Sequence, residues 1–392
     1  MVNGDVITDG WRSGEVRDAL DLCLSCKGCK SDCPVNVDMA TYKAEFLAHH
    51  YAHRLRPAAH YSMGWLPLWA RLAAYAPRMV NAVTRTPGLR TLVKAVGGIA
   101  PQRQLPRFAR QRFTQWFATH TPAGDGRNGD VVLWPDTFTN SFHPAVAKSA
   151  VEVLQDAGFR VKVPVSAVCC GLTWISTGQL GVAQRVLRRT LRILAPDLRA
   201  STPVVVLEPS CAAVFRSDLP DLLYGDEDAA RLAGQTVTLA ELLRDQAADW
   251  HPPALDARAI VQPHCHQHAV LGMDADRALL ADHGVDAEIL DAGCCGLAGN
   301  FGFERGHYDV SMKCAEHALL PAVRAADEDT LILADGFSCR TQIEQADTGR
   351  RAIHLAELLA AATVRNMACN AREEGPRTLV DAASKSSHFN SR

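Results

Sequence analysis

A chain of 392 residues is long enough to form two or three domains, each with a core of its own. Its net charge of −2 excludes a nucleic-acid-binding protein that works by bulk electrostatics, and no apolar run approaches the length of a membrane-spanning helix. Thirteen cysteines without an apolar leader segment favour metal ligands in the reducing cytoplasm over the disulfides of a secreted protein.

Four cysteines near the N-terminus follow a C-x2-C-x2-C-x3-C-P spacing; they are Cys23, Cys26, Cys29 and Cys33. Bacterial ferredoxins hold a [4Fe–4S] cluster on cysteines at this spacing. Zinc sites usually separate two C-x2-C pairs by a longer stretch, so the spacing favours iron–sulfur over zinc. With a helix expected at 37–53 behind the run, residues 1–53 are predicted to form a ferredoxin-like [4Fe–4S] segment.

Acidic residues are absent from the next part of the chain. Between Phe46 and Gly124 there is no Asp or Glu but eleven Lys or Arg, so the rest of the chain carries a charge of −13. Residues 54–122 are predicted to form short apolar and basic helices broken by proline and glycine. Such a region suits either the interface of an anionic bilayer or a collar that docks on an acidic partner domain, and the steering of electron-transfer partners by opposite charge favours docking.

Strands and helices alternate beyond a Gly/Asp/Asn-rich linker at 123–130, which marks a domain boundary. In residues 131–250 we expect strands at 131–134, 160–165 and 203–207 and helices at 144–157 and 178–194. The pattern repeats in residues 258–362, with strands at 259–261, 287–290 and 330–333 and helices at 275–283, 308–325 and 353–362. Alternation of this kind predicts parallel α/β sheets, and residues 366–392 are expected to be a mobile tail.

A Cys-Cys-Gly motif followed by a later Ser-Cys occurs once in each half. The cysteines are Cys169, Cys170 and Cys211 in the first half and Cys294, Cys295 and Cys339 in the second, which adds Cys265. Thr137 stands where Cys265 would align. Each thiol follows a predicted strand, and the carboxyl ends of parallel strands are where such sheets gather ligands. Repetition of the motif favours metal ligands over small buried hydrophobic residues.

These motifs carry a family resemblance. Residues 131–360 resemble two copies of the cysteine-rich CCG domain, which is found in the cysteine-rich subunit of heterodisulfide reductase and in the iron–sulfur subunit of glycolate and lactate oxidases. With the preceding run and basic region, residues 15–362 resemble the C-terminal part of bacterial FAD-linked D-2-hydroxyacid (glycolate/D-lactate) dehydrogenases. These proteins join a flavin domain, a ferredoxin-like domain and two CCG domains. The fold class implied is α+β overall, with a helical ferredoxin-like iron–sulfur segment followed by two repeated parallel α/β CCG domains.

The resemblance also implies cofactors and partners. A second cluster would lie on Cys265, Cys294, Cys295 and Cys339, whereas Thr137 leaves Cys169, Cys170 and Cys211 as a three-ligand, labile or structural metal site. FAD would belong to a partner subunit or a missing domain that oxidises a D-2-hydroxyacid, and the clusters would pass its electrons to a membrane quinone or another carrier. The chain is thus expected to be the electron-transfer component of an oxidoreductase and not a complete catalyst. It would be cytoplasmic, or peripheral at the inner face of the cell membrane.

Only one ferredoxin-type run is present. In two-cluster ferredoxin domains the fourth cysteine of each run ligates the other cluster. The related dehydrogenases carry the second run upstream, together with the flavin domain. Cys33 therefore either points at a cluster completed elsewhere, as in a split subunit or a truncated gene product, or closes a single cluster locally.

Two other functions stay open on the sequence. One is a heterodisulfide-reductase-like subunit that acts on a disulfide, and the other is a cysteine-rich zinc or structural scaffold module. His264, His266 and His268 flank Cys265, where imidazole either ligates a metal or supports the thiolates. Cys314 is expected to be a buried thiol and Cys369 to be incidental.

Overall fold

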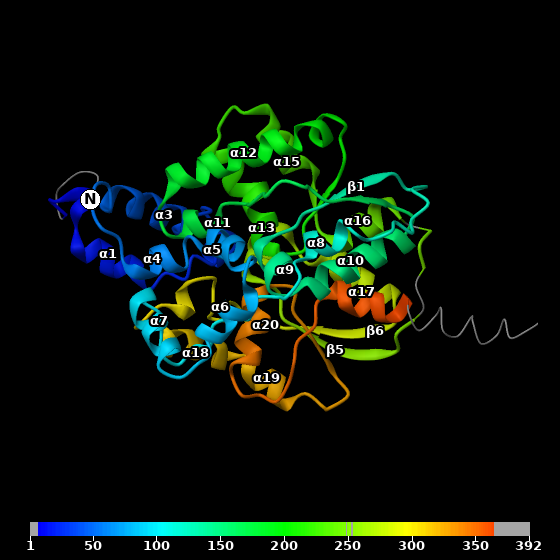
Figure 1. Cartoon of the computed structure of the whole chain (residues 1–392). Helices are drawn as coiled ribbons and strands as arrows, with labels where there is room; N and C mark the ends of the chain where they lie inside the picture. The colour runs from blue at the N-terminus through cyan, green and yellow to red at the C-terminus, as the bar shows by residue number, and fades with distance from the viewer. Residues whose placement is uncertain (1–6, 248, 252–253, 364–392) are drawn as a thin grey trace, which may run out of the picture.

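A computed structural model describes residues 7–247, 249–251 and 254–363 (Figure 1). This part of the chain combines many helices with two parallel sheets, as the alternating pattern predicted. Figure 1 shows the N-terminal helices at one end of the molecule and strands β1, β5 and β6 at the other. The expected tail at 366–392, with Cys369, lies outside the described residues.

The N-terminal segment is helical on both sides of the cysteine run. Its helices are α1 (Gly14–Asp21), α2 (Gly28–Asp32) and α3 (Met39–His50), preceded by the 3-10 turn η1 (Gly10–Arg12). Helix α3 begins two residues later than expected because Asp38 caps it, its carboxylate accepting a hydrogen bond from the Thr41 N–H at 3.1 Å. Helix α2 is a single short turn inside the run.

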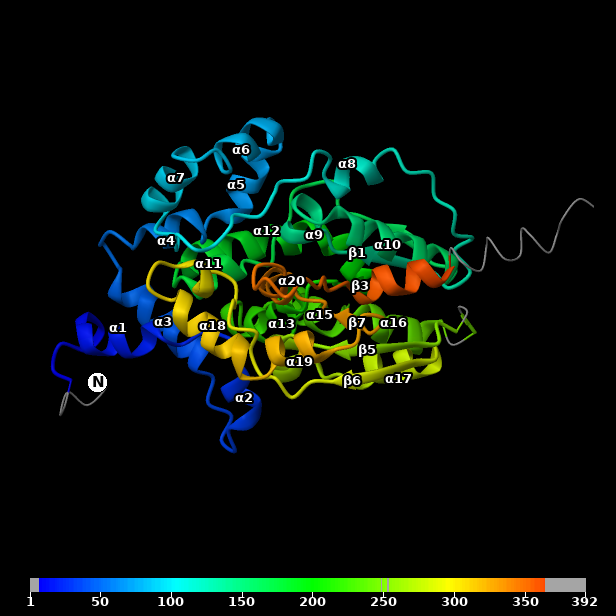
Figure 2. The same cartoon turned by 90° about the horizontal axis from the view of Figure 1, so that it is seen from below.

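The acid-poor region forms short helices. They are α4 (Ala58–Ser62), α5 (Leu66–Ala73), α6 (Pro77–Val83), α7 (Leu89–Gly97) and α8 (Phe113–Phe117). Pro67 and Pro77 lie in the first turns of α5 and α6, where a helix needs no N–H donor. Figure 2 shows α5, α6 and α7 standing together on one side of the molecule, and we call residues 58–97 the helical collar.

The first sheet is parallel, with strand order β2-β1-β3-β4. Its strands are β1 (Asp130–Leu133), β2 (Arg160–Lys162), β3 (Val204–Val205) and β4 (Thr236–Val237). The helices around it are α9 (Thr137–Ser141), α10 (Pro144–Asp156), α11 (Leu172–Ser176), α12 (Leu180–Arg199), α13 (Pro209–Ala213), the π-helix η2 (Val214–Asp218), α14 (Leu219–Leu222), α15 (Glu227–Gln235) and α16 (Leu239–Gln246).

The second sheet repeats this order as β6-β5-β7, and a parallel bridge from Leu333 to Ile353 stands where the fourth strand would lie. Its strands are β5 (Ala257–Val261), β6 (Val285–Ile289) and β7 (Leu331–Leu333). Its helices are the π-helix η3 (Gln267–Leu271), α17 (Asp274–Asp282), the 3-10 turn η4 (Phe301–Phe303), α18 (Tyr308–His317), α19 (Leu319–Ala325) and α20 (Phe337–Glu344), followed by a helix over residues 355–363.

One expected helix is divided in two. The sequence predicts a single helix over 308–325, but α18 ends at His317 and α19 starts at Leu319. Pro321 cannot donate a hydrogen bond to the His317 carbonyl, so the helix cannot run through this point.

The two sheets share one apolar core. Val131, Leu133 and Val205 of the first sheet and Val261 and Leu333 of the second belong to the same buried cluster. Because this core fixes both sheets, it also fixes the loops at their strand ends, which carry the thiols. Among the described helices, none is long and apolar enough to cross a bilayer.

Candidate metal centre

The two Cys-Cys-Gly turns have the same backbone geometry. Gly171 and Gly296 both have a φ of +83°, a conformation that favours glycine. In each turn the glycine N–H donates to the Sγ of the first cysteine at 3.4 Å, to Cys169 in one and Cys294 in the other. The shared geometry supports the internal repeat that the sequence predicts.

The structure brings together the four predicted thiols of the second half. Cys265 follows β5, Cys294 and Cys295 follow β6, and Cys339 lies in α20 after β7. Cys294 is in side-chain contact with Cys265 and Cys295, and Cys295 is in contact with Cys339. We call these four residues the second thiol set.

These contacts shift the pKa values of the four thiols in different directions. Hydrogen bonds from Cys294 and Cys339 lower the pKa of Cys295 well below its usual value, despite burial. Contact with Cys295 and burial raise the pKa of Cys339. Since a thiolate is the form that binds metals, a buried group of thiols that includes one with a lowered pKa fits a cation such as iron or zinc.

Two histidines beside Cys265 differ in role. The side chains of His264, Cys265 and His266 place ligand atoms within 4.8 Å of one another. The Nδ1 of His264 accepts a hydrogen bond from the His266 N–H at 3.1 Å, so the proton is on Nε2, which lies 3.8 Å from Glu208. His266 is buried, and among the described residues its Nε2 has no hydrogen-bond partner. His266 is therefore the better candidate ligand, while His264 supports the site; His268 is exposed.

Cys169, Cys170 and Cys211 also come together, and we call them the first thiol set. The Cys170 and Cys211 sulfurs are 3.0 Å apart, and Cys169 contacts Cys170. Burial raises the pKa of Cys211 to about 11 despite its hydrogen bond with Cys170. Thr137 faces the same cavity as these thiols, but it offers a hydroxyl where the second half has Cys265. The first half thus offers three thiols where the second thiol set offers four.

The four cysteines of the N-terminal run have different surroundings. Cys29 is exposed, and Cys23 is half-buried with its carbonyl accepting a hydrogen bond from Lys43 Nζ at 2.6 Å. The pKa of Cys33 is lowered by backbone N–H groups of its own loop, first that of Val37. Cys26 instead contacts Cys294 of the second thiol set, and this contact lowers the pKa of Cys26 to about 6. The spacing of the run gives no signal for that long-range contact.

Glu208 joins the two halves beside both thiol sets. This buried carboxylate accepts hydrogen bonds from the N–H of Phe337, at the start of α20, and from the Ser210 hydroxyl, both at 2.9 Å. Sequence reasoning missed Glu208, although an acidic residue between a strand and the motif Pro-Ser-Cys was a signal for it.

A cavity of about 510 Å³ lies between the thiol sets and the collar. Cys169, Cys170, Cys211 and Cys265 line its inner wall. Its outer wall comes from collar residues such as Leu66, Trp69 and Val96, so most of the lining is apolar. An apolar ligand in this cavity would touch thiols from both halves.

Comparison with known proteins finds a family match within the first half of the chain. Residues 136–216, which contain the first thiol set, match the family model of the cysteine-rich domain called CCG. The chain therefore contains a CCG cysteine-rich domain, as the sequence motif indicated.

Several curated proteins are homologous to the chain. It is 26% identical to the D-2-hydroxyglutarate dehydrogenase of Escherichia coli over 86% of its own length and 34% of that protein. It is 26% identical to a subunit of the anaerobic glycerol-3-phosphate dehydrogenase of Escherichia coli, over 74% of the chain and 72% of that subunit. It is 28% identical to the lactate utilization protein A of Geobacillus kaustophilus, over 59% of the chain and 98% of that protein. The chain thus spans about a third of the length of the D-2-hydroxyglutarate dehydrogenases it matches.

Proposed function

We propose that this chain is an iron–sulfur electron-transfer component of a flavin-linked D-2-hydroxyacid dehydrogenase. The observation that carries the proposal is the convergence of Cys265, Cys294, Cys295 and Cys339 from three strand ends. The similarity to a D-2-hydroxyglutarate dehydrogenase and to a lactate utilization protein supports the substrate class.

The second thiol set is the main cofactor site in this proposal, and the N-terminal run contributes a further [4Fe–4S] site. A bound iron–sulfur cluster would supply one-electron oxidation and reduction. The residues of this chain would set the reduction potential of the cluster in two ways. Burial of the thiols would exclude water from it, and the Gly296 N–H would donate a hydrogen bond to the sulfur of Cys294. The first thiol set would be a three-thiol site that is labile or structural.

FAD would be bound outside this chain. The D-2-hydroxyglutarate dehydrogenases are about three times as long as the matched part, which leaves room there for a flavin domain. A partner subunit or domain of that kind would oxidise the hydroxyacid and pass electrons singly to the thiolate-bound centre.

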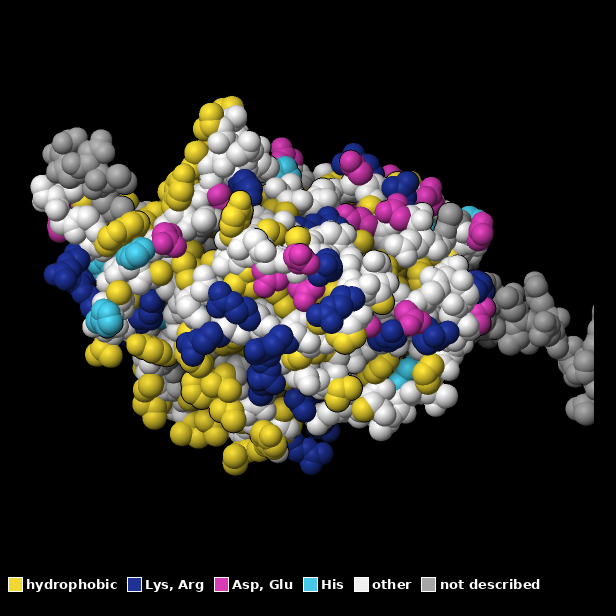
Figure 3. All heavy atoms as spheres, turned by 90° about the horizontal axis from the view of Figure 1, so that it is seen from above, with side chains coloured by type: hydrophobic (Ala, Val, Ile, Leu, Met, Phe, Trp, Pro, Cys, Tyr) yellow, Lys and Arg dark blue, Asp and Glu magenta, His cyan; other side chains and the backbone are white. Residues whose placement is uncertain are grey.

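A lipid-soluble quinone is the acceptor that fits the collar side of the molecule. Large apolar side chains are exposed on α5, α6 and α7 and in the link between α5 and α6; they are Leu68, Trp69, Leu72, Tyr75, Met79, Val83, Leu89, Leu92 and Val96. Figure 3 shows apolar side chains gathered on this face beside a group of Lys and Arg. Arg78, Arg85, Arg107 and Arg110 line a hollow there, and no acid occurs between 46 and 124.

Apolar area flanked by arginine favours an anionic bilayer over an acidic protein domain as the surface that the collar meets, because an acidic domain would not cover the apolar side chains. The charge pattern of the sequence alone favoured an acidic partner domain, so the exposed apolar side chains reverse that preference. The protein would then lie at the inner face of the cell membrane, with Trp69 and Val96 at the cavity's outer wall.

A second candidate function is reduction of a disulfide in the cavity. It is favoured by one observation, the presence of thiols from both halves on the inner cavity wall. It differs from the first proposal in needing no flavoprotein once electrons are supplied to the centre.

The test mixes the anaerobically purified chain with a FAD-linked D-2-hydroxyacid dehydrogenase subunit and a D-2-hydroxyacid. We expect the visible absorbance of the centre to bleach and an EPR signal to appear only when all three are present, followed by reoxidation with a short-chain quinone. Reduction of a disulfide by the dithionite-reduced chain alone, without quinone reduction, would support the second candidate instead.

A further inference from the structure

Cys26 has different surroundings from Cys29 of the same run. Its side chain contacts Cys294 of the second thiol set, while Cys29, three residues on, is exposed. Leu24 and Ser25, just before it, line the same cavity as His264 and Cys265. The run therefore reaches into the second half of the chain at Cys26.

The backbone around Cys26 is shaped for this contact. Ser25 and Lys27, on either side, have φ values of +55° and +60°, which non-glycine residues rarely adopt. Such conformations persist where the surroundings hold them, and they gather at functional sites. Between these two residues Cys26 is partly buried, and the Lys27 side chain is buried.

Lys27 anchors the turn. Its ammonium group is buried and forms ion pairs with Asp38 at 2.7 Å and with Asp218 at 3.0 Å. Asp218 belongs to the first half, so the pair fixes the run to the body of the molecule. A buried charge with two partners of opposite sign is costly to move, so the position of Cys26 is well determined.

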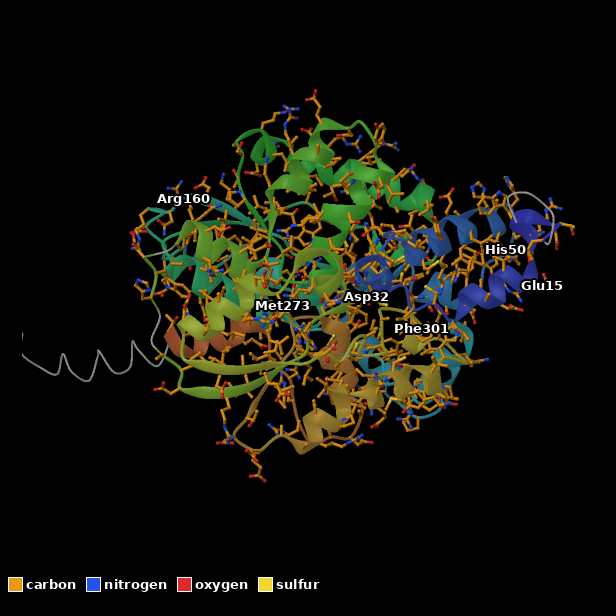
Figure 4. All side chains as sticks on the ribbon, turned by 180° about the vertical axis from the view of Figure 1, so that it is seen from behind. Glu15, Asp32, His50, Arg160, Met273 and Phe301 are labelled. Atoms are coloured by element: carbon orange, nitrogen blue, oxygen red, sulfur yellow. The ribbon has the colours of Figure 1, made fainter. Side chains whose placement is uncertain are left out.

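Helix α2 of the N-terminal run also contacts both halves of the chain. Lys30 donates to the Ser217 hydroxyl at 2.8 Å, and Asp32 lies 3.4 Å from His268. Helix α2, whose Asp32 is labelled in Figure 4, packs against η3 of the second half. The segment that holds Cys26 is thus clamped on both sides.

We propose that Cys26 is a ligand of the metal centre in the second half, together with Cys265, Cys294, Cys295 and Cys339. This inference rests on the proposed function, since it requires a metal centre on the second thiol set. A cubane cluster takes four thiolates, so the site offers one thiol more than a cubane needs. Cys26 would then tie the N-terminal segment to this centre, and the further site of the run would be held by Cys23, Cys29 and Cys33.

The experiment compares the serine variants Cys26→Ser, Cys29→Ser and Cys314→Ser by EPR of the reduced, anaerobically purified protein. Cys29 is the matched control from the same run, and Cys314 is a control thiol near Cys26 and Cys295. A fourth variant, Cys339→Ser, identifies the EPR signal of the centre in the second half, because that signal should disappear when one of its ligands is removed.

We expect Cys26→Ser to shift the g values of that signal or remove it, and to lower iron per chain, while the two controls leave the signal unchanged. An unaltered signal in Cys26→Ser would overturn the inference. Wild-type protein without iron and sulfide would contradict the proposed function itself, a result seen before any variant is made.

A second measurement does not depend on the folding of variants. Diamide oxidises two neighbouring thiols to a disulfide and takes up their two electrons and two protons. In the metal-free wild-type protein we expect peptide mapping to find Cys26 linked to Cys294. Linkage of Cys26 to Cys23 or Cys29 would contradict the contact on which the inference depends.

Discussion

The ammonium group of Lys27 lies 3.0 Å from a carboxylate oxygen of Asp218, and both side chains are buried. This pair joins the N-terminal run to a π-helix of the first half, far away in the sequence. It holds Cys26 beside the second thiol set. The cysteine spacing of the run alone gives no sign that it contacts the second thiol set.

Replacing Lys27 by Met is therefore expected to lower the free energy of unfolding by about 3 kcal/mol, because it leaves the Asp218 charge buried without its partner. Lys30→Met is the control, since Lys30 is about one-third exposed and lies 3.8 Å from Asp38. That change should cost less than about 1 kcal/mol. Denaturant unfolding of the metal-free proteins measures both, and equal losses would contradict the importance of the buried pair.

Gly296→Ala should destabilise the second Cys-Cys-Gly turn. An added Cβ would overlap the Ser311 carbonyl oxygen, and the backbone φ is +83°. Backbone strain alone costs about 1–3 kcal/mol, and the overlap adds to it, so the variant should lose bound iron as well as stability. Gly306→Ala, with a φ of +97° and open space around the Cβ, is the matched control. Iron retention in Gly296→Ala at the control's level would show that the turn is not required.

The collar should bind anionic vesicles. Leu72 and Leu92 are 52% and 60% exposed, and burial of a leucine in the bilayer is worth about 1.5 kcal/mol or more. The double change to Glu should therefore weaken co-sedimentation with phosphatidylglycerol vesicles by about a hundredfold. Tyr224→Glu, at a 95% exposed position outside the collar, should leave binding unchanged. Binding that survives the double change would point to another surface.

Stability should fall in mild acid because of His60. Burial, and then the nearby Arg56, lower the pKa of this histidine from 6.5 to about 4. Between those pH values the unfolded chain binds a proton that the native protein excludes, so stability is lost as the pH falls from 6.5 towards 4. The loss is about 3 kcal/mol at most. His60→Phe keeps an aromatic ring against Tyr51. The melting temperature of this variant should depend less on pH between 6.5 and 4 than that of the wild-type protein. An unchanged dependence on pH would mean that other groups cause the loss of stability.

The thiol groupings within each half were predictable from the sequence. Cys294, Cys295 and Cys339 each follow a strand of a parallel sheet, and the ends of adjacent strands meet at one edge. The same logic places Thr137 at the edge occupied by the first thiol set. Hydrophobic runs located the strands, and Asp38 and Pro321 mark helix boundaries that local capping and proline chemistry could have set.

The contacts between distant segments were not predictable in this way. The association of Cys26 with Cys294 depends on the Lys27–Asp218 pair and on left-handed backbone at Ser25, and neither has a periodic or spaced signal. The cavity likewise needs the collar to fold back over both thiol sets. Packing between segments that are far apart in the sequence determines the Cys26–Cys294 contact and the cavity. A short stretch of sequence gives no information about such packing.

The central claim, that the second thiol set holds an iron–sulfur centre, is tested most directly by metal and acid-labile sulfide analysis of anaerobically purified protein. We expect iron and sulfide in equal amounts in the wild-type protein and a marked loss of both in Cys295→Ser. Zinc without sulfide, or wild-type iron and sulfide in Cys295→Ser, would contradict the claim.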